Sequence, residues 1–271
     1  MPSYVITGVS RGIGFELLKQ LSNNPSNIII GLVRDKYTTD QKITTELGQQ
    51  QNVHILEADV TNYDALKLSV ANAATITGGK IDCIIANAAF VSTWSAYDPV
   101  GDLGKSPKKL EQDLLDSFSI NVIGNIHLFN LYMPLVLKGS AKKVVTISSG
   151  MADLDFVTEF EISSAAPYSM SKAAMNMAVA KFSAQYKKDG VLFISISPGL
   201  VETGGYVSTT EEQKRGAREM GAKFAKYAPN FTGPVTPEVS VKSVLSVIAE
   251  ASIAGGSAGT FVSHFGNKQW L

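Results

Sequence analysis

The sequence predicts an α/β protein with a doubly wound, mostly parallel sheet of seven strands and helices on both faces. Seven short apolar runs recur along the 271 residues. Each run is almost continuously apolar, as expected for parallel strands that are buried on both faces. Segments of helical spacing, long enough to cross between parallel strands, separate the first six runs. The expected strands are Tyr4–Ile6, Ile28–Val33, Val53–Leu56, Cys83–Ala86, Val144–Ile147, Leu192–Ile196 and Gly259–Val262.

Helices are expected in the segments between these strands. Pro107 suits the first turn of the longest helix, and the hydroxyl of Ser106 before it would cap the free amides. No internal repeat, low-complexity tract or interdomain linker is visible, so residues 1–271 are expected to form one domain. The expected helices are Phe15–Leu21, Thr38–Gln51, Asn62–Thr77, Pro107–Leu137, Ala166–Lys188, Thr209–Tyr227 and Glu238–Ala251.

Charge and composition argue against several classes of partner. Lys plus Arg equals Asp plus Glu at 24 each, so no overall field favours nucleic acid or an anionic membrane. The only cysteine is Cys83, which excludes an intramolecular disulfide, and the three histidines are scattered, so no metal site is expected. No run approaches the roughly 20 apolar residues of a membrane span. The glycine motif described next begins too early to leave room for a leader, and we expect a cytoplasmic protein.

A glycine-rich turn follows the first strand directly and leads into an amphipathic helix. Its glycines would let the chain turn tightly and bring backbone amides, at the positive end of the helix, close to a pyrophosphate. The placement between strand and helix favours dinucleotide binding over an ordinary turn. The candidate residues are Gly8, Ser10, Arg11, Gly12, Ile13 and Gly14.

The end of the second strand indicates which dinucleotide is bound. An acidic residue there would accept hydrogen bonds from the free ribose hydroxyls of NAD, but Val33 occupies the position and Arg34 follows it. Arg34 and Arg11 together would bind the 2′-phosphate of NADP(H). Alternatively, Arg34 is a solvated charge and Asp35 contacts the ribose, which would leave Arg11 unexplained.

A tyrosine and a lysine four residues apart open the fifth long helix, so that their side chains share one face. A free phenol has a pKa of about 10, and a nearby ammonium lowers it. Tyr168, assisted by Lys172, is therefore a candidate general acid for carbonyl reduction, or a base for alcohol oxidation. Such a pair is common by chance on exposed helices. The order of the surrounding motifs argues for function.

These motifs, spread over residues 7 to 203, resemble the short-chain dehydrogenase/reductase family. The turn has that family's Gly-x-x-x-Gly-x-Gly spacing, and the Tyr-x-x-x-Lys pair lies between strands ending in Ser148-Ser149 and Ser197-Pro198-Gly199. Within the family, the Ala-Asn-Ala-Ala segment and the C-terminal end are similar to fungal and yeast NADPH-dependent carbonyl reductases and polyketide-pathway ketoreductases. The resemblance implies a single-domain Rossmann fold, the cofactor NADP(H), and hydride transfer to or from a small-molecule carbonyl or alcohol.

The resemblance also assigns catalytic roles. It selects Ser149 over Ser148 as the hydroxyl that positions the substrate oxygen, because strand alternation sends only one of the two serines to the site. Asn121 matches the asparagine that binds a water linking Lys172 to solvent. Asparagine is a poor residue inside a helix, so a local backbone distortion is expected there. Asn121 as an ordinary surface residue is the alternative.

Further cofactor contacts follow from the family's motifs. Asp59 and Val60, after the third strand, match a pair that lies beside adenine. Asn87 would brace the sheet near the cofactor, although alanine stands at 86 and 89 where the family has asparagine and glycine. After the sixth strand, the threonine of a Pro-Gly turn would contact the nicotinamide carboxamide. The residues of this turn are Pro198, Gly199, Val201 and Thr203.

Two segments longer than is usual in the family, about 90–105 and 150–165, follow the carboxyl ends of strands and would form walls of a substrate pocket. A polar segment at about 204–228 would act as a lid. The aromatic and apolar side chains of the two long segments line the pocket or, equally well, pack these segments onto the body. They are Trp94, Tyr97, Met151, Phe156 and Phe160.

The leading hypothesis is an NADPH-dependent reductase of a ketone or aldehyde. The alternatives are an NAD-dependent alcohol dehydrogenase and a catalytically silent, dinucleotide-sensing regulator on the same fold. Pairing of the fourth and fifth helices across a twofold axis would give a homodimer or homotetramer, but neither helix has an apolar stripe broad enough to decide.

Overall fold

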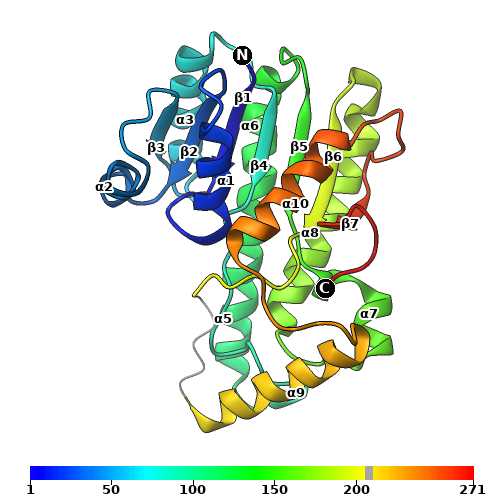
Figure 1. Cartoon of the computed structure of the whole chain (residues 1–271). Coiled ribbons are helices and arrows are strands. Elements are labelled where there is room, and N and C mark those ends of the chain that lie inside the picture. Colours follow the sequence, from blue (N-terminus) through cyan, green and yellow to red (C-terminus); the bar gives the residue numbers. More distant parts are fainter. Residues whose placement is uncertain (205–209) are drawn as a thin grey trace.

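A computed structural model of the chain describes residues 1–204 and 210–271 (Figure 1). Seven strands form one sheet in the order β3-β2-β1-β4-β5-β6-β7, and every pair of neighbours is parallel. All seven expected strands are present, which confirms the predicted fold class. The strands are β1 (Ser3–Thr7), β2 (Ile28–Val33), β3 (Val53–Glu57), β4 (Cys83–Ala86), β5 (Lys143–Ile147), β6 (Leu192–Ser197) and β7 (Phe261–Ser263).

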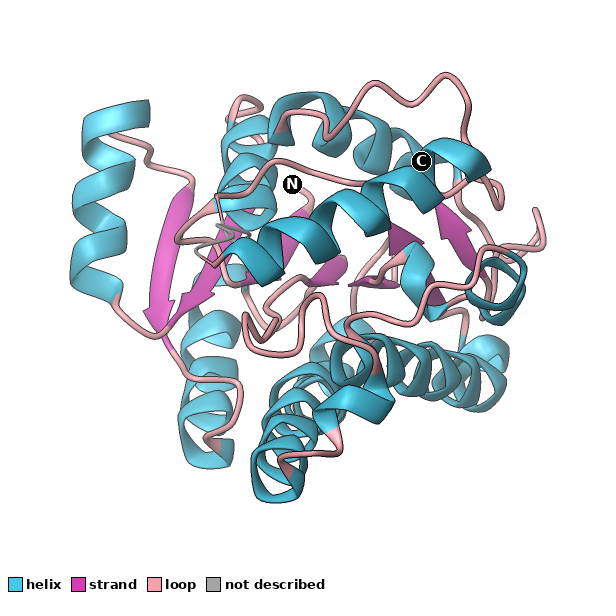
Figure 2. Ribbon diagram, turned by 90° about the horizontal axis from the view of Figure 1, so that it is seen from below, coloured by secondary structure: helices cyan, strands magenta, loops and turns pink. Residues whose placement is uncertain are grey.

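Helices cover both faces of the sheet (Figure 2). Successive strand residues point to opposite faces, and both faces are buried: Val5 packs in the core on one side and Ile6 in the core on the other. This double burial is why the strands are apolar throughout. One face carries α1 (Gly12–Ser22), α2 (Lys36–Leu47) and α10 (Pro237–Glu250), and the other carries α3 (Tyr63–Thr77), α6 (Gly124–Val136) and α8 (Ala166–Tyr186).

The remaining helices lie toward the carboxyl ends of the strands, where α5, α7 and α9 extend beyond the sheet (Figure 1). The segments expected as loops at 90–105 and 150–165 contain two of the short helices. These elements are α4 (Val100–Leu103), α5 (Pro107–Phe118), α7 (Leu154–Glu159) and α9 (Glu211–Tyr227), with short 3₁₀ turns at Gly150–Ala152 and Lys187–Asp189.

The long helix predicted from Pro107 to Leu137 contains a break. A π-helical turn, Ser119–Ile123, joins α5 to α6, so the distortion expected around Asn121 is present. Ser106 occupies the N-cap position of α5, but its side chain makes no capping hydrogen bond, so the prediction for its hydroxyl was wrong. Pro107 does lie in the first turn, where a missing amide proton is tolerated.

The strand order reverses between β1 and β4, and the carboxyl ends of these strands flank the switch point where open α/β sheets bind ligands. Asn87, directly after β4, ties the two ends together: its Nδ2 donates to the carbonyl oxygens of Thr7 (3.0 Å) and Gly8 (3.3 Å). The bracing predicted for Asn87 is therefore present in the structure. It places the glycine turn at the switch point.

No helix in the described part of the chain is long and apolar enough to cross a membrane. Within residues 1–204 and 210–271, no group of three or more His, Cys, Asp or Glu side chains is placed to hold a metal ion.

Candidate active site

The turn between β1 and α1 can be built only with glycine at its tightest point. A Cβ on Gly14 would lie 2.2 Å from the carbonyl oxygen of Gly8 and 2.5 Å from Nδ2 of Asn87. Gly8 and Gly12 have positive φ angles of 74° and 57°, which residues with side chains rarely adopt. The turn leads into the N-terminus of α1, whose amides lack partners within the helix. This cradle fits the pyrophosphate of a dinucleotide.

Three cationic residues come from the turn and from the elements next to it. Arg11 and Arg34 are exposed, from the turn and from the end of β2. The third is Lys42 of α2, whose Nζ lies 3.3 Å from the carbonyl oxygen of Ser10 and 4.1 Å from the ring centroid of Phe15. Lys42 was not predicted from the sequence to contact the cofactor. Its place in the helix that follows Arg34 was the available signal.

Asp35, the alternative ribose ligand, is engaged in local structure. It is the N-cap of α2, and its carboxylate accepts hydrogen bonds from the amide and the hydroxyl of Thr38 at 2.9 and 2.6 Å. These hydrogen bonds hold the pKa of Asp35 below its usual value. Asp35 therefore caps a helix that begins at Lys36, two residues before the predicted start at Thr38.

The pair after β3 lies beside the start of α6. The carboxylate of Asp59 accepts hydrogen bonds from the amide and hydroxyl of Thr61 at 2.8 and 2.7 Å. Val60 is buried, and a Cβ on Gly124 would lie 2.6 Å from its carbonyl oxygen. Because Gly124 has no side chain, α6 can lie directly against Val60. This contact holds in place the turn that is predicted to lie beside adenine.

Tyr168 and Lys172 come together on α8, next to the end of β5. The Lys172 ammonium lies 5.6 Å from the ring centroid of Tyr168 and donates a 2.7 Å hydrogen bond to the carbonyl oxygen of Ile147. The Lys172 side chain is only 4% exposed, and burial lowers its pKa to about 8. This hydrogen bond holds Lys172 at the end of β5, and Ser149 follows Ile147 by two residues.

The two serines after β5 differ as strand alternation predicts. Ser148 is buried and its hydroxyl donates to Oδ1 of Asn176 at 2.8 Å, a structural contact. Ser149 is half-buried, and its hydroxyl oxygen accepts a 3.3 Å hydrogen bond from the amide of Met151. This geometry leaves Ser149 as the serine that a substrate can reach.

Asn121 lies in the π turn and is fully buried. Its Nδ2 donates to Oγ of Ser171 (2.9 Å) and to the carbonyl oxygen of Phe90 (3.0 Å), and its Oδ1 accepts from the amide of Phe90 (2.7 Å). Both amide protons are therefore engaged within the protein. The side chain holds α8, the π turn and the segment after β4 together, which rules out a plain surface role.

The segment after β6 returns to the glycine turn. Gly199 has a φ of 80°, and a Cβ there would lie 2.8 Å from Cε1 of the buried His264. Val201 pairs with Val235 in an isolated bridge. Thr203 lies against the turn, since a Cβ on Gly12 would be 3.3 Å from its Cγ2. The Pro198–Thr203 segment thus runs from the end of β6 to the glycine turn.

Comparison with known proteins agrees with this geometry. The family model described as short chain dehydrogenase matches residues 3–214. The chain belongs to the short-chain dehydrogenase family. It is therefore an oxidoreductase of a family that uses a nicotinamide dinucleotide and acts on small molecules.

Fungal members of the short-chain dehydrogenase family match over their full length. The chain is 58% identical to the short chain dehydrogenase virK of Hypocrea virens and 48% identical to the short-chain dehydrogenase/reductase iacC of Pestalotiopsis fici, each over 100% of both chains.

Solved carbonyl reductases share the fold. The carbonyl reductase Sniffer of D. melanogaster has a TM-score of 0.78 at 22% identity and covers 98% of each chain. The NADPH-bound carbonyl reductase from chicken fatty liver has a TM-score of 0.79 at 20% identity, covering 98% of this chain and 93% of that one.

In this short-chain dehydrogenase, the aromatic residues of the 150–165 segment pack it against α9. Phe156 is 4% exposed, and its ring centroid lies 4.5 Å from that of Tyr227, while Phe160 lies 5.0 Å from Tyr227. In the 90–105 segment, Tyr97 lies against α9. A Cβ atom added to Gly216 of α9 would be 2.7 Å from Cβ of Tyr97. Of the two roles expected for these side chains, Tyr97, Phe156 and Phe160 show the packing role.

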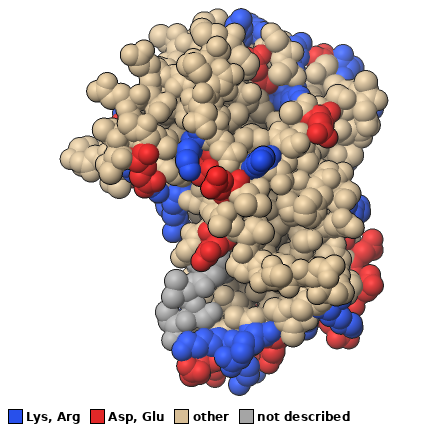
Figure 3. All heavy atoms as spheres, in the orientation of Figure 1, with Lys and Arg blue, Asp and Glu red and all other residues tan. Residues whose placement is uncertain are grey.

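Helix α9 has one apolar and one charged side. Its Phe224 is 3% exposed and packs with Met220 and Tyr227 against the C-terminal end of the chain and the 150–165 segment. Figure 3 shows Lys and Arg side chains gathered along the end of the molecule that α9 forms. The helix therefore covers the ends of both long segments. Its basic residues are Lys214, Arg215, Arg218, Lys223 and Lys226.

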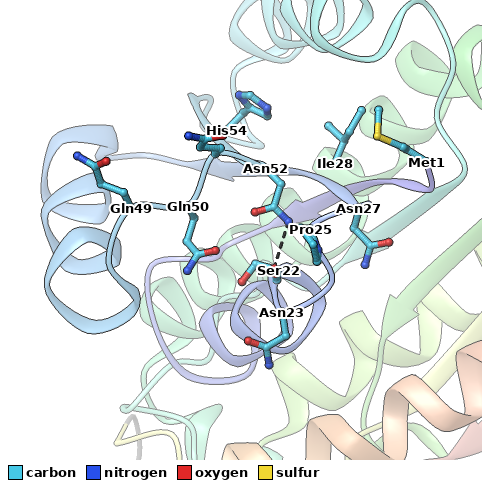
Figure 4. A pocket seen from close by; sticks show the side chains of 11 residues that line it. Met1, Ser22, Asn23, Pro25, Asn27, Ile28, Gln49, Gln50, Asn52 and His54 are labelled. Carbon is cyan, nitrogen blue, oxygen red and sulfur yellow. Dashed lines mark hydrogen bonds between the residues drawn. The ribbon is translucent and has the colours of Figure 1, made fainter.

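A hollow of about 640 Å³ lies at the opposite end of the strands (Figure 4). It is bordered by Met1, before β1, and Ile28, at the start of β2, and Asn52 donates a 3.1 Å hydrogen bond to the carbonyl oxygen of Ser22 there. Because these are the amino ends of the strands, the hollow is separate from the candidate active site.

Proposed function

We propose that this short-chain dehydrogenase is an NADPH-dependent reductase that converts a ketone or aldehyde into an alcohol, with Tyr168 as the general acid. The observation that carries the proposal is the buried Lys172 ammonium, held 5.6 Å from the Tyr168 ring by its bond to Ile147. A buried ammonium is costly unless it is paired with an opposite charge. The phenolate that develops on Tyr168 during the reaction is such a charge. A catalytically silent dinucleotide sensor would not need this buried ammonium.

When bound, the reduced nicotinamide supplies a hydride to the carbonyl carbon. Tyr168 donates its phenolic proton to the carbonyl oxygen, and the hydroxyl of Ser149 hydrogen-bonds to the same oxygen and orients it. The Lys172 ammonium stabilises the phenolate that remains, because a nearby opposite charge favours the ionised form. One hydride and one proton give the alcohol. Solvent then returns a proton to Tyr168, and in the oxidative direction the same groups act in reverse.

The proposed preference for NADP(H) rests on three cations, Arg11, Arg34 and Lys42, around the outer end of the glycine turn. Two guanidinium groups and an ammonium match the charge of a 2′-phosphate, whereas NAD offers them no anion. The NAD-dependent alternative needs Asp35, whose carboxylate oxygens both accept from Thr38. The NADPH bound to the carbonyl reductase from chicken fatty liver fits the same preference.

The substrate side is proposed to consist of the segments 90–105 and 150–165, covered by α9 as a lid within one domain formed by the whole chain. Part of the expected lid, residues 205–209, lies outside the described residues. A cytoplasmic location and the absence of nucleic-acid, membrane and metal partners remain expectations from composition.

A homodimer is the proposed assembly, with a homotetramer as the larger option. The described helices that would pair carry exposed apolar side chains: Leu115 on α5, Ile123 in the π turn, and Met170 and Met177 on α8. Light scattering measures the mass directly, and a monomer at micromolar concentration would contradict the proposal.

A carbonyl panel tests the proposed function. Purified protein is mixed with NADPH or NADH and a series of aliphatic and aromatic ketones and aldehydes, and cofactor oxidation is followed by absorbance. We expect turnover of at least one carbonyl compound, with a higher kcat/KM for NADPH than for NADH. Tight NADPH binding without any turnover would instead support the dinucleotide-sensing alternative.

A further inference from the structure

The last residues of the chain pack against the segment that carries Ser149. Trp270 is 2% exposed, and its ring stacks on Phe261 of β7 at a centroid distance of 4.4 Å and an angle of 16°. A Cβ on Gly150 would lie 2.6 Å from Cβ of Trp270 and 2.8 Å from its Cγ. The amide of Gly150 donates a 2.9 Å hydrogen bond to the hydroxyl of Ser197. The residue after Ser149 is therefore fixed between Trp270 and the end of β6.

The same tail holds the end of α9. The hydroxyl of Tyr227, the last residue of α9, donates to the carbonyl oxygen of Lys268 and accepts from the amide of Trp270, both at 3.0 Å. Lys268 also pairs with the buried Asp153 at the start of α7, at 3.5 Å. The C-terminus lies close to α7 in Figure 1. The tail thus joins the Ser149 segment, α7 and α9.

We propose that the C-terminal tail, Phe265–Leu271, is a positioning element of the active site: Trp270 sets the position of Ser149, and the tail fixes α9 over the substrate. This inference rests on the proposed function. The tail contacts described above all lie on the substrate side, away from the glycine turn. The tail should therefore affect the handling of the carbonyl substrate and leave cofactor binding unchanged.

The expected effects follow from the contacts. Removing the indole leaves a space beside Gly150 into which the Ser149 segment can move, and a displacement of about 1 Å of a reacting group can cost about 100-fold in rate. Trp270→Ala should therefore lower kcat by roughly 10- to 100-fold. Trp270→Phe, which keeps a ring against Gly150 and Phe261, should restore most of this loss. Tyr227→Phe removes only the two hydrogen bonds of its hydroxyl and should raise KM with little change in kcat.

The test compares kcat, KM, NADPH affinity and hydrogen exchange in the wild type and these three variants. Tyr132→Phe is the matched control, because it removes a buried hydroxyl bonded to Ser69 (2.8 Å) in the core beneath α3 and α6. The control should lose stability without any change in kcat or KM. In Trp270→Ala we also expect faster exchange of the Met151 amide, which donates to Ser149.

Each result has a defined meaning. Wild-type protein without carbonyl reduction would refute the proposed function, and the Met151 exchange rate would still test the tail. If Trp270→Ala does not fold, the KM of Tyr227→Phe decides the question, because Trp270→Phe is expected to keep most of the wild-type activity. A folded Trp270→Ala with the kcat and Met151 exchange of the wild type, or a Tyr227→Phe with the KM of the wild type, would overturn the proposal.

Discussion

The side-chain amide of Asn121 donates a 2.9 Å hydrogen bond to the hydroxyl of Ser171, and this contact joins the π turn to the helix that carries Tyr168 and Lys172. The same amide pairs with both backbone polar groups of Phe90. The π turn, α8 and the segment after β4 are therefore held by one buried residue. Such a fully satisfied network fixes the relative positions of the groups around it.

Replacing Asn121 by alanine should be strongly destabilising. The change leaves the amide and carbonyl of Phe90 and the hydroxyl of Ser171 without this partner in a buried environment, at a cost of roughly 2 to 4 kcal/mol. Denaturant unfolding of Asn121→Ala measures the loss. Asn130→Ala, at an exposed position on α6, is the control and should stay within about 0.5 kcal/mol of the wild type. A loss equal to that of the control would show that the network is not important for stability.

The buried Lys172 should make stability depend on pH. Its pKa is about 8 in the folded protein and 10.5 when unfolded. Between these values the unfolded chain binds more protons, so unfolding becomes less favourable as pH rises. Relative to Lys172→Met, the free energy of unfolding of the cofactor-free wild type should rise by roughly 1.4 kcal/mol per pH unit over this range.

Denaturant titrations at several pH values above 8 test this dependence. Lys181→Met, which removes an exposed lysine from the same helix, serves as the control. Its free energy of unfolding should change with pH in the same way as that of the wild type. A difference between wild type and Lys172→Met that does not change with pH would contradict the assigned burial.

Cofactor selectivity should depend on the cations at the outer end of the glycine turn. Arg34→Ala and Lys42→Ala should each weaken NADPH binding by about 10-fold or more, since a charge-assisted bond is worth about 1.5 to 3 kcal/mol. NADH affinity should change little. Titration of both cofactors by fluorescence gives the two affinities, and equal losses for NADPH and NADH would exclude contacts with the 2′-phosphate. Lys36→Ala, on the same helix and paired with Asp40, is the control.

The sequence was sufficient to predict the sheet and the distorted helix. Each strand is buried on both faces, so it appears as a continuous apolar run such as Ile28–Val33, and the long gaps between runs require crossover helices. The break at Asn121 could be predicted because an asparagine among apolar neighbours conflicts with a regular helix. Both signals depend only on residues that are close together in the chain, so they can be recognised in a single sequence.

Contacts between distant segments could not be predicted. Whether Ser106 caps α5 depends on a side-chain rotamer, and the role of Trp270 depends on the chain end returning to Gly150, 120 positions earlier. Lys42 reaches the glycine turn only because the fold brings its side chain to Ser10 and Phe15, about 30 positions earlier in the chain. The aromatic residues of the 150–165 segment gave no indication of whether they faced a substrate or α9. Such questions are decided by tertiary packing, which pattern and propensity do not specify.

The most direct test of the account is the effect of Tyr168→Phe on carbonyl reduction with NADPH bound. Loss of the phenolic hydroxyl removes the proton donor and leaves the ring that lies beside Lys172. We predict that kcat falls by about 100-fold or more, within the range of general acid catalysis, while NADPH affinity is preserved. A variant that binds NADPH and reduces the carbonyl substrate at the wild-type rate would contradict the central claim.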